Sequence, residues 1–349
     1  MRIGIIGHFG GTEIFTDGQT VKVKSLYNGL ENALPQSIKI DIVDTYYLKH
    51  NKIKLFNDFM KCLIFDGSII FLPATNGRKI LFKLMYIIQH FFHKNVYHDC
   101  IGGALVKELK KNPKWIVYLN SFKVNWMESQ IQVDALEKLG IKNAKYLPNF
   151  KNIKPLQKEE LNTEFGTPLK FCTFSRVLPE KGIEDAAIAI SNVNNRYGEK
   201  KVILDIYGPI QPGYEEWFEQ VKKKYGDNIS YKGIIDPSKS VQVLKQYYSL
   251  LFPTRYYTEG MPGTIIDAFF SGVPVISRRW AYCNQMITDD YNGISYNFDN
   301  PKQLDKIILK CVENPDYLVN MRKNCILDAQ KYTEVYVINK IIKDLDIGR

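Results

Sequence analysis

The chain has 349 residues, of which 45% are hydrophobic and 24% are charged, a composition typical of a globular protein. This length favours two domains, and the lack of internal repeats and low-complexity tracts argues against a solenoid or a disordered protein. The net charge of +10 is spread along the chain, so it permits nucleic acid, an anionic membrane or a phosphorylated substrate as partner without selecting among them.

Short apolar runs alternate with longer amphipathic stretches through the first half of the chain, which predicts strands alternating with helices. The expected strands cover 3–6, 38–43, 69–72, 115–119 and 145–147. The expected helices cover 19–33, 79–93, 103–111 and 123–139. A polar stretch over 148–168 then breaks the pattern and carries three prolines, which indicates a linker.

A second series of the same kind follows the linker. Its expected strands cover 169–174, 201–207, 229–231, 249–252 and 273–276, and its expected helices cover 182–193, 213–225, 237–247 and 263–271. The last segments, 301–312, 315–332 and 334–342, look helical throughout. This alternation predicts an α/β protein with two Rossmann-like domains, 1–150 and 151–333, whose parallel sheets face each other across a cleft. The final helix, within 334–349, is expected to brace the first domain.

Six scattered cysteines show neither CxxC nor metal-ligand spacing, which fits a reducing compartment better than a disulfide framework. The N-terminal stretch MRIGIIGHFG lacks the long apolar core of a signal peptide. No stretch reaches the roughly 18 uncharged apolar residues that span a bilayer. We therefore expect a cytoplasmic protein that uses no metal and no cofactor.

The most informative stretch is PTRYYTEGMPGTIIDAFFSGVPVI, residues 253–276. Glu259 lies in a Gly/Pro-rich turn, and Asp267 follows inside an apolar helical run. The first N–H groups of a helix lack intrahelical partners, and the helix dipole favours negative charge there. The pattern therefore predicts an anion site with a carboxylate on either side, which suits a nucleotide-sugar.

A second motif, FSRVLPEKGIEDA over 174–186, follows the first strand of the second domain. Arg176 and Lys181 flank a Pro-containing turn, and two cations at the carboxyl end of a strand can clamp a diphosphate. The alternative is that Arg176 pairs with a local acid and Lys181 is a solvated residue at a helix start. The neighbouring anion site favours the clamp.

Together, SRVLPEKG and EGMPGTIIDAFFSGVPVI resemble the two signatures of family-4 retaining glycosyltransferases of the GT-B fold, particularly those that build bacterial capsule, exopolysaccharide or O-antigen units. The glycine loop near the N-terminus and YLPNF at 146–150 extend this resemblance to most of the chain. In the second signature aspartate replaces the more usual terminal glutamate, and it is one methylene shorter.

The resemblance implies specific roles in binding a donor sugar. Arg176 and Lys181 would hold its diphosphate, Glu259 would reach the hydroxyls of the transferred sugar, and Asp267 would hold the ribose. The backbone of the helix start would contact the distal phosphate, at Met261, Pro262, Gly263 and Thr264. The alternative for Asp267 is an ordinary helix acid that meets a nearby lysine.

Three further loops are candidates for contact with the donor. Gly208 and Ile234 follow strands of the second domain, where they could leave room for a nucleobase and read its edge, or simply form tight turns. In the first domain the loop GHFGGTEIFTDGQT lacks the spacing of a dinucleotide fingerprint. Its glycines, Gly10, Gly11 and Gly18, could approach donor or acceptor, or only connect a strand to a helix.

His98, in VYHDCIGG, is expected to follow a short strand and to point at the cleft. Similar enzymes carry a histidine near the reacting sugar, so His98 is the second candidate catalytic residue beside Glu259. A lone histidine is more often structural, and that alternative stays open.

Residues 78–99 are apolar on nearly every helical face and carry basic residues but no acid before Asp99. Such a helix is usually core, but basic residues beside exposed aromatics could rest on an anionic bilayer. The segment is therefore a candidate for peripheral contact with the inner face of the cell membrane.

We therefore expect a metal-independent hexosyltransferase that moves a sugar, with retention of configuration, from a nucleotide-sugar to a glycan acceptor. UDP-sugars are the most common donors among similar enzymes, and a polyprenyl-diphosphate-linked oligosaccharide is the expected acceptor. The alternative within this fold is a sugar-nucleotide epimerase. A nucleic-acid-binding protein is disfavoured, because no recognised binding motif or basic-aromatic strip is present.

Overall fold

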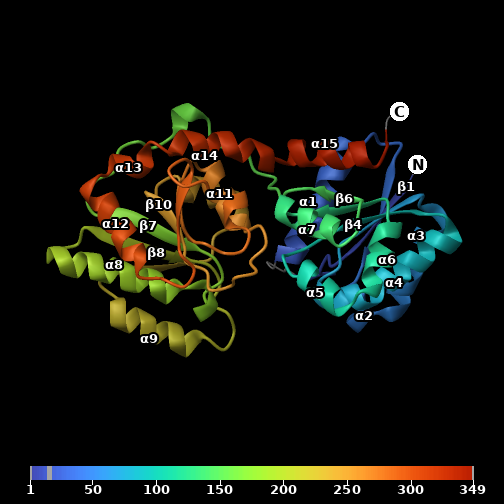
Figure 1. The fold of residues 1–349 in the computed structure, drawn as a ribbon, viewed down its shortest axis with the longest axis horizontal. Helices are drawn as coiled ribbons and strands as arrows, with labels where there is room; N and C mark the ends of the chain where they lie inside the picture. Colours follow the sequence, from blue (N-terminus) through green and yellow to red (C-terminus); the bar gives the residue numbers. More distant parts are fainter. Residues whose placement is uncertain (1, 14–17, 348–349) are drawn as a thin grey trace. The chain divides into compact units, whose positions relative to one another are not determined.

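The computed structural model describes residues 2–13 and 18–347 and divides the chain into two compact units. Unit 1 comprises residues 1–152 and 334–349, and unit 2 comprises residues 153–333. The last segment of the chain thus belongs with the first unit. Both units are α/β structures, with helices on both faces of a parallel sheet (Figure 1).

Within its described residues, unit 1 forms a six-stranded sheet of order β2-β1-β3-β4-β5-β6, and every neighbouring pair is parallel. The strands are β1 (Arg2–Gly7), β2 (Lys39–Asp44), β3 (Ser68–Phe71), β4 (Asn95–Asp99), β5 (Val124–Met127) and β6 (Ala144–Tyr146). The helices are α1 (Gly18–Ala33), α2 (Tyr47–His50), α3 (Lys52–Phe65), α4 (Thr75–Phe92), α5 (Leu105–Lys111), α6 (Lys114–Ser121), α7 (Gln130–Lys138) and α15 (Glu334–Asp344).

Two apolar cores lie on the two faces of this sheet. Helices α1 and α15 share one of them, where Leu26 of α1 and Ile338 of α15 are fully or almost fully buried. Gly29 lets these two helices approach closely, since a Cβ at that position would collide with Ile338. Helices α3 to α7 contribute to the core on the other face. A sheet covered on both faces explains why the inner strands β1 and β3 are buried almost throughout.

Two expectations for unit 1 are wrong in detail, and one long helix was not expected. The segment 115–119 is not a strand but part of α6, because Trp115 and Leu119 lie one helical turn apart and are both buried. The expected helix over 123–139 begins with strand β5, and α7 starts only at Gln130. Helix α3 has no counterpart among the expected elements.

Unit 2 forms, within its described residues, a second six-stranded parallel sheet, of order β12-β11-β10-β7-β8-β9. The strands are β7 (Leu169–Phe174), β8 (Val202–Tyr207), β9 (Ile229–Gly233), β10 (Ser249–Phe252), β11 (Val275–Arg278) and β12 (Gly293–Tyr296). The α-helices are α8 (Ile183–Tyr197), α9 (Glu215–Tyr225), α10 (Ser240–Leu244), α11 (Gly263–Phe270), α12 (Gln303–Glu313), α13 (Asp316–Val319) and α14 (Arg322–Ala329). Short 3₁₀ helices are η1 (Lys158–Glu160), η2 (Pro179–Lys181), η3 (Pro237–Lys239), η4 (Cys283–Gln285) and η5 (Gln330–Tyr332).

The strand order of each sheet contains one switch point, where the chain changes the direction in which it adds strands. In unit 1 the switch lies between β1 and β3, and in unit 2 it lies between β7 and β10. Loops that leave the strands on either side of a switch diverge to opposite faces of the sheet, so a crevice forms at the carboxyl ends of those strands. The fold thus marks one candidate binding position in each unit.

The expected linker over 148–168 is mostly packed structure. Its residues from 153 onward belong to unit 2. Leu156 is buried, and its N–H donates to the carbonyl of Phe270 over 2.8 Å. Phe165 packs edge to face against Tyr248, with ring centroids 5.3 Å apart. Prolines and polar residues suggested a free segment, but these apolar contacts anchor it.

A buried charge network holds the carboxyl ends of β4 and β5 in unit 1. Lys22 Nζ donates to Asp99 Oδ1 over 2.7 Å, to the carbonyl of Cys100 over 2.9 Å and to Glu128 Oε1 over 3.1 Å. Although burial lowers the pKa of Lys22, the two carboxylates raise it above its ordinary value, so the ammonium stays charged. The network therefore depends on all three charges.

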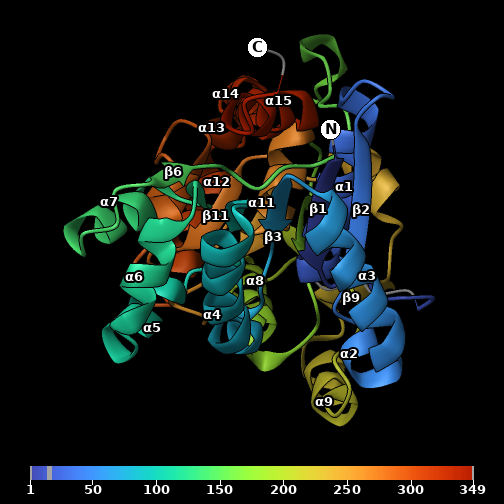
Figure 2. The same ribbon diagram turned by 90° about the vertical axis from the view of Figure 1, so that its right-hand side faces the viewer.

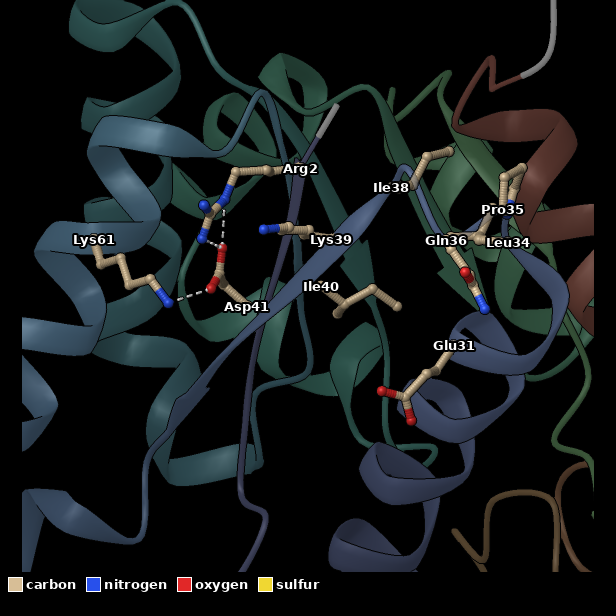
Figure 3. A pocket seen from close by; sticks show the side chains of 10 residues that line it. All are labelled: Arg2, Glu31, Leu34, Pro35, Gln36, Ile38, Lys39, Ile40, Asp41 and Lys61. Atoms are coloured by element: carbon tan, nitrogen blue, oxygen red, sulfur yellow. Dashed lines mark hydrogen bonds and ion pairs between the residues drawn. The ribbon is translucent and has the colours of Figure 1, made fainter.

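A second charged group lies at the amino ends of β1 and β2. Figure 3 shows Arg2 and Lys61 converging on Asp41; Lys61 Nζ lies 2.6 Å from Asp41 Oδ1 and Arg2 Nε lies 2.8 Å from Asp41 Oδ2. These side chains line a cavity of about 500 Å³. Because ligands of parallel sheets bind beyond the carboxyl ends of the strands, this cavity at the opposite edge is not the candidate site.

Lys22→Met should destabilise unit 1 strongly, because it leaves Asp99 and Glu128 buried without their cation. Breaking a buried ion pair in this way costs about 3–5 kcal/mol. Urea unfolding measures the loss, and Lys24→Met, an exposed position on the same helix, serves as control. Equal free energies of unfolding for Lys22→Met and Lys24→Met would contradict the structural role of the network.

Asp66→Asn should stabilise the protein at neutral pH and have little effect at pH 4. Burial raises the pKa of the Asp66 carboxyl to about 6, although Arg2 Nε lies 3.4 Å away. The ordinary value is about 4, so between roughly pH 4 and pH 6 the folded state keeps a proton that the unfolded state has lost, and stability falls as the pH rises. Thermal unfolding at both pH values tests this; a difference between variant and parent that is the same at pH 4 and pH 7.5 would contradict it.

Candidate active site

The candidate site of unit 2 lies at the switch point between β7 and β10. Strand β7 ends at Phe174 and is followed by the turn that carries Arg176 and Lys181. Strand β10 ends at Phe252 and is followed by the loop that carries Glu259. Parallel neighbouring strands place both loops at the same edge of the sheet. The fold therefore brings the two sequence motifs together.

Lys181 and Glu259 form the centre of this site. Lys181 Nζ donates to Glu259 Oε2 over 2.8 Å, and Thr254 Oγ1 donates to the same oxygen over 3.0 Å. The ammonium also lies 5.2 Å from the centre of the Tyr256 ring. The Lys181 and Glu259 side chains are only 13% and 18% exposed, so a cation and an anion are held together in a partly dehydrated position.

The turn before α8 can pack this closely only because residue 182 is glycine. Gly182 has a φ of 71°, and a Cβ there would collide with the carbonyl oxygen of Pro253. The two motifs are thus in backbone contact across the switch point. Lys181 is the last residue of the 3₁₀ turn η2 and directly precedes Gly182, so this backbone contact fixes its position.

Helix α11 starts without a side-chain cap. Its cap residue is Pro262, which makes no side-chain hydrogen bond to the first turn. Met261 and Pro262 are buried, while Gly263 and Thr264 are half-buried. The Thr264 hydroxyl oxygen is buried and has no hydrogen-bond partner among the described residues. The free N–H groups of an uncapped helix start, together with an unused hydroxyl, can donate hydrogen bonds to an anionic oxygen.

Arg176 is exposed, unlike Lys181. Its guanidinium donates to Gln211 Oε1 over 3.1 Å, so it pairs with an amide and not with a carboxylate. The structure therefore places it at the carboxyl edge of the sheet without a competing negative partner among its described hydrogen bonds and ion pairs. A solvent-exposed arginine in this position can turn towards a diphosphate.

Asp267 lies one turn into α11 and is 5% exposed. Its Oδ1 accepts a hydrogen bond from Ser240 Oγ over 3.2 Å, at the start of α10. The structure thus connects this carboxylate to a neighbouring helix through a serine. To bind a ribose, Asp267 would have to accept a hydrogen bond from a ribose hydroxyl beside the one that it accepts from Ser240.

Gly208 and Ile234 both lie at the carboxyl edge of the second sheet. Gly208 has a φ of 129°, and a Cβ there would collide with the carbonyl oxygen of Ser175. Packing of the backbone thus explains this glycine without a ligand. Ile234 directly follows β9 and is 67% exposed. The role of both residues in reading a base stays a prediction.

The sequence reasoning missed a brace behind the site. The Asp185 carboxylate accepts hydrogen bonds from Arg255 Nη2 over 2.5 Å and from Arg278 Nη2 over 3.0 Å. The backbone N–H of Arg255 donates to the carbonyl of Glu180 over 2.7 Å. Arg278 is 5% exposed. Asp185 and Arg255 stand inside the two motifs, so a search for opposite charges between the motifs would have found this pair.

The glycine loop of unit 1 is held by Asp44, at the end of β2. Its carboxylate accepts from the N–H groups of Phe9 and Gly11, each over 2.8 Å. Gly10 and Gly11 have φ values of 89° and 57°, and a Cβ on Gly11 would collide with the Tyr46 ring. These N–H groups are therefore occupied by a carboxylate.

The start of α1 completes the described part of this loop. Gly18 is exposed, and no described atom lies within 4 Å of the position that a Cβ would take, so the turn does not require glycine there for space. The part of the loop over 14–17 lies outside the described residues.

The expectation that His98 follows a short strand is wrong, because His98 lies inside strand β4. The strand β4 runs through His98, which is fully buried between the rings of Phe71 and Phe82, at centroid distances of 5.1 and 5.0 Å. Burial lowers its pKa to about 3, so the ring is neutral at physiological pH. Its Nδ1 donates to Asn125 Oδ1 over 3.1 Å. His98 is thus buried in the core, in register with Phe71, the last residue of β3, and its catalytic role stays a prediction.

The described residues contain no group of three or more His, Cys, Asp and Glu side chains that could hold a metal ion. Positively charged side chains in or beside the two motifs include Lys181, Arg176, Arg255 and Arg278. The chemistry this geometry can perform is therefore binding of an anionic group beside a carboxylate that can accept hydrogen bonds from hydroxyls.

Comparison with curated proteins identifies several glycosyltransferases as relatives. "Uncharacterized glycosyltransferase MJ1069" of Methanocaldococcus jannaschii is 22% identical over 78% of this chain and 71% of that protein. Alpha-monoglucosyldiacylglycerol synthase of Streptococcus pneumoniae is 26% identical over 75% of this chain and 52% of that protein. The chain thus spans about half the length of the pneumococcal synthase.

Solved structures with the same fold are also glycosyltransferase structures. Anabaena Alr3699/HepE in complex with UDP and glucose matches with a TM-score of 0.70 over 100% of both chains, at 13% identity. The lipopolysaccharide outer core galactosyltransferase WaaB matches with a TM-score of 0.68 over 99% of both chains, at 16% identity. These matches show that the fold is GT-B.

The family profile described as "Glycosyl transferases group 1" matches residues 157–331, half of the chain. The matched range contains both motifs, the Lys181–Glu259 pair and helix α11. The chain therefore belongs to the group 1 glycosyl transferases, enzymes of the GT-B fold that use nucleotide-sugars.

Proposed function

We propose that this glycosyltransferase moves a hexose from a UDP-sugar to a lipid-linked glycan acceptor, with retention of configuration and without a metal ion. The observation that carries the proposal is the Lys181–Glu259 pair beside the uncapped start of α11. A cation and a helix start suit a diphosphate, and a carboxylate next to them suits sugar hydroxyls.

Binding of the donor would exchange the partners of this pair. The diphosphate would bind Lys181 and the N–H groups of Gly263 and Thr264. Glu259 would then be able to accept hydrogen bonds from the sugar hydroxyls. Thr254 would keep Glu259 oriented, since its hydroxyl already donates to the carboxylate. Asp267 would bind the ribose through the carboxylate that now accepts a hydrogen bond from Ser240.

Glycosyl transfer passes through an oxocarbenium-like state while negative charge grows on the leaving diphosphate. Lys181, Arg176 and the α11 start would stabilise that charge, and preorganised charges of this kind contribute most when little reorganisation is needed. Retention would follow if the leaving phosphate accepts the proton of the acceptor on the same face of the sugar. No covalent nucleophile is then required.

Known relatives support the choice of donor and acceptor. Alr3699/HepE has been solved with UDP-glucose, and the pneumococcal transferase GtfA with UDP and GlcNAc. A Campylobacter jejuni relative, 26% identical over 31% of this chain, is named as an N-acetylgalactosaminyltransferase acting on diacetylbacillosaminyl-diphospho-undecaprenol. These names favour UDP as nucleotide and a polyprenyl-diphosphate-linked glycan as acceptor.

Helix α4 supports peripheral contact with the cytoplasmic face of a membrane. The segment 78–99 is not one helix, because α4 ends at Phe92 and strand β4 follows. One side of α4 is core, but its other side exposes four large apolar residues, Ile80, Ile87, Phe91 and Phe92. Lys79 and Lys83 are exposed on the same helix. None of the helices within the described residues combines the length and hydrophobicity needed to cross a bilayer.

Removing either proposed diphosphate ligand should weaken UDP binding. A hydrogen bond to a charged group contributes about 1.5–3 kcal/mol, so Lys181→Ala and Arg176→Ala should each raise the Kd for UDP by roughly 10- to 150-fold. Titration calorimetry measures this, with the exposed Lys200→Ala as control for loss of a positive charge. Parent-like UDP affinity in both site variants would refute the assignment of the diphosphate position.

Glu259→Gln should retain UDP affinity within a few-fold but lose sugar transfer by about 100-fold or more, the scale of a lost transition-state contact. The assay follows transfer from a panel of UDP-sugars to a lipid-diphosphate sugar in the presence of EDTA, and NMR reports the anomeric configuration of the product. Product with retained configuration is expected. Conversion of the donor without acceptor would instead indicate an epimerase, and transfer that requires a divalent cation would contradict the metal-free mechanism.

A further inference from the structure

Unit 1 contains an apolar groove of about 640 Å³ between α3 and α4. Figure 2 shows β1 and β3 behind and between these two helices. The floor of the groove includes Ile6, Val43, Leu72 and Pro73, which lie at or just beyond the carboxyl ends of β1, β2 and β3. The groove therefore sits at the switch point of the first sheet, between β1 and β3.

The packing of the helices explains why this position is open. Helix α3 packs on β1 and β2, whereas α4 packs on β4 and on α6. The two helices thus diverge and leave the ends of β1 and β3 uncovered. A volume of this size falls within the roughly 300–1,000 Å³ of small-molecule sites.

The walls of the groove are almost entirely apolar. Helix α3 contributes Leu55, Phe56 and Phe59, and α4 contributes Ile80, Leu81 and Leu84. Phe56 is 62% and Ile80 is 68% exposed, so large apolar side chains face water here. A contiguous apolar surface of this kind marks a binding site for an apolar partner.

The polar residues of the groove are basic or neutral. Lys49, Lys52 and His8 are among the lining residues, and none of the lining residues that the structure describes is an Asp or Glu. His8 and Gln19 bring the groove to the loop between β1 and α1. A ligand that fits has a hydrocarbon part and a negatively charged head, and its head would lie at the carboxyl edge of the sheet.

We propose that this groove binds the hydrocarbon chain of a phosphate-bearing lipid, with Lys49 and Lys52 beside its phosphate, and that this lipid is the acceptor of the transferred sugar. The identification as acceptor rests on the proposed function. The groove then selects acceptors by their tail, while unit 2 selects the donor. Hydrocarbon burial supplies affinity and the lysines supply orientation.

The groove borders the face of α4 that we propose to contact a membrane, and Ile80 belongs to both surfaces. Ile87, Phe91 and Phe92 belong to that outer face and do not line the groove. Ile53, on α3, is 76% exposed and does not line it either. These residues provide matched controls, because they are equally apolar and exposed on the same two helices.

Binding of farnesyl diphosphate, a water-soluble isoprenoid, tests the proposal, with inorganic pyrophosphate as the head-group control. Calorimetry should show that the full chain binds farnesyl diphosphate at least about tenfold more tightly than pyrophosphate, because the groove buries the hydrocarbon. Phe56→Glu and Ile80→Glu should each remove most of that difference. Both positions are exposed, so the variants should fold, which thermal unfolding checks.

Ile53→Glu and Phe91→Glu are the controls and should leave farnesyl diphosphate binding unchanged. Equal affinity of the parent for both probes overturns the proposal, and so does an equal loss of affinity in groove and control variants. Binding to anionic phospholipid vesicles that Phe91→Glu abolishes, without any preference for farnesyl diphosphate, would assign this side of unit 1 to the membrane alone.

The outcome is separable from that of the proposed function. UDP binding is measured on the same groove variants and should equal that of the parent, because all the groove residues belong to unit 1. If the parent binds UDP but does not prefer farnesyl diphosphate over pyrophosphate, only the groove proposal is overturned. A tail preference without UDP binding in the parent refutes the proposed donor and still supports the groove as a lipid-binding site.

Discussion

The strand order of the second sheet is the constraint on which the candidate active site depends. Because the chain reverses direction between β7 and β10, the loops that follow these two strands meet at the carboxyl edge although 78 residues separate Lys181 from Glu259. The same reversal directs the start of α11 to that edge. One topological feature thus supplies a cation, a carboxylate and a helix start at a single place, which is the combination that a nucleotide-sugar requires.

Backbone contact and buried charge then hold these groups in position. Gly182 allows the first loop to touch Pro253 in the second, and Asp185 ties Arg255 and Arg278 to the start of α8. A site held in this way needs little rearrangement when charge develops on a leaving group, which is the main electrostatic advantage that an enzyme has over water. The exception is the Lys181–Glu259 pair, whose partners have to change when a donor binds.

The sequence was sufficient for the fold class and for the two motifs that the structure brings together, because both motifs carry local signals that the topology does not alter. Prediction from the sequence failed where tertiary packing determines whether a segment forms a helix or a strand. The β-branched residues around Ile116 favoured a strand, but contact of Trp115 with Phe82 selects a helix. His98 looked like a residue beyond the strand, but β4 continues to Asp99 and buries the ring between Phe71 and Phe82. The groove of unit 1 depends on residues far apart in the sequence, so no local pattern could indicate it, whereas the pairing of Asp185 with Arg255 needed a comparison of charges between the two motifs.

Hydrogen–deuterium exchange with and without UDP tests the central claim most directly, since it reports where the nucleotide binds without any substitution. The account predicts slower exchange at the N–H groups of the α11 start, within residues 261–264, and in the turn over 176–182, because these groups would contact the diphosphate or be covered by it. Protection confined to unit 1, or unchanged exchange at both segments under saturating UDP, would contradict the assignment of the donor site to the switch point between β7 and β10.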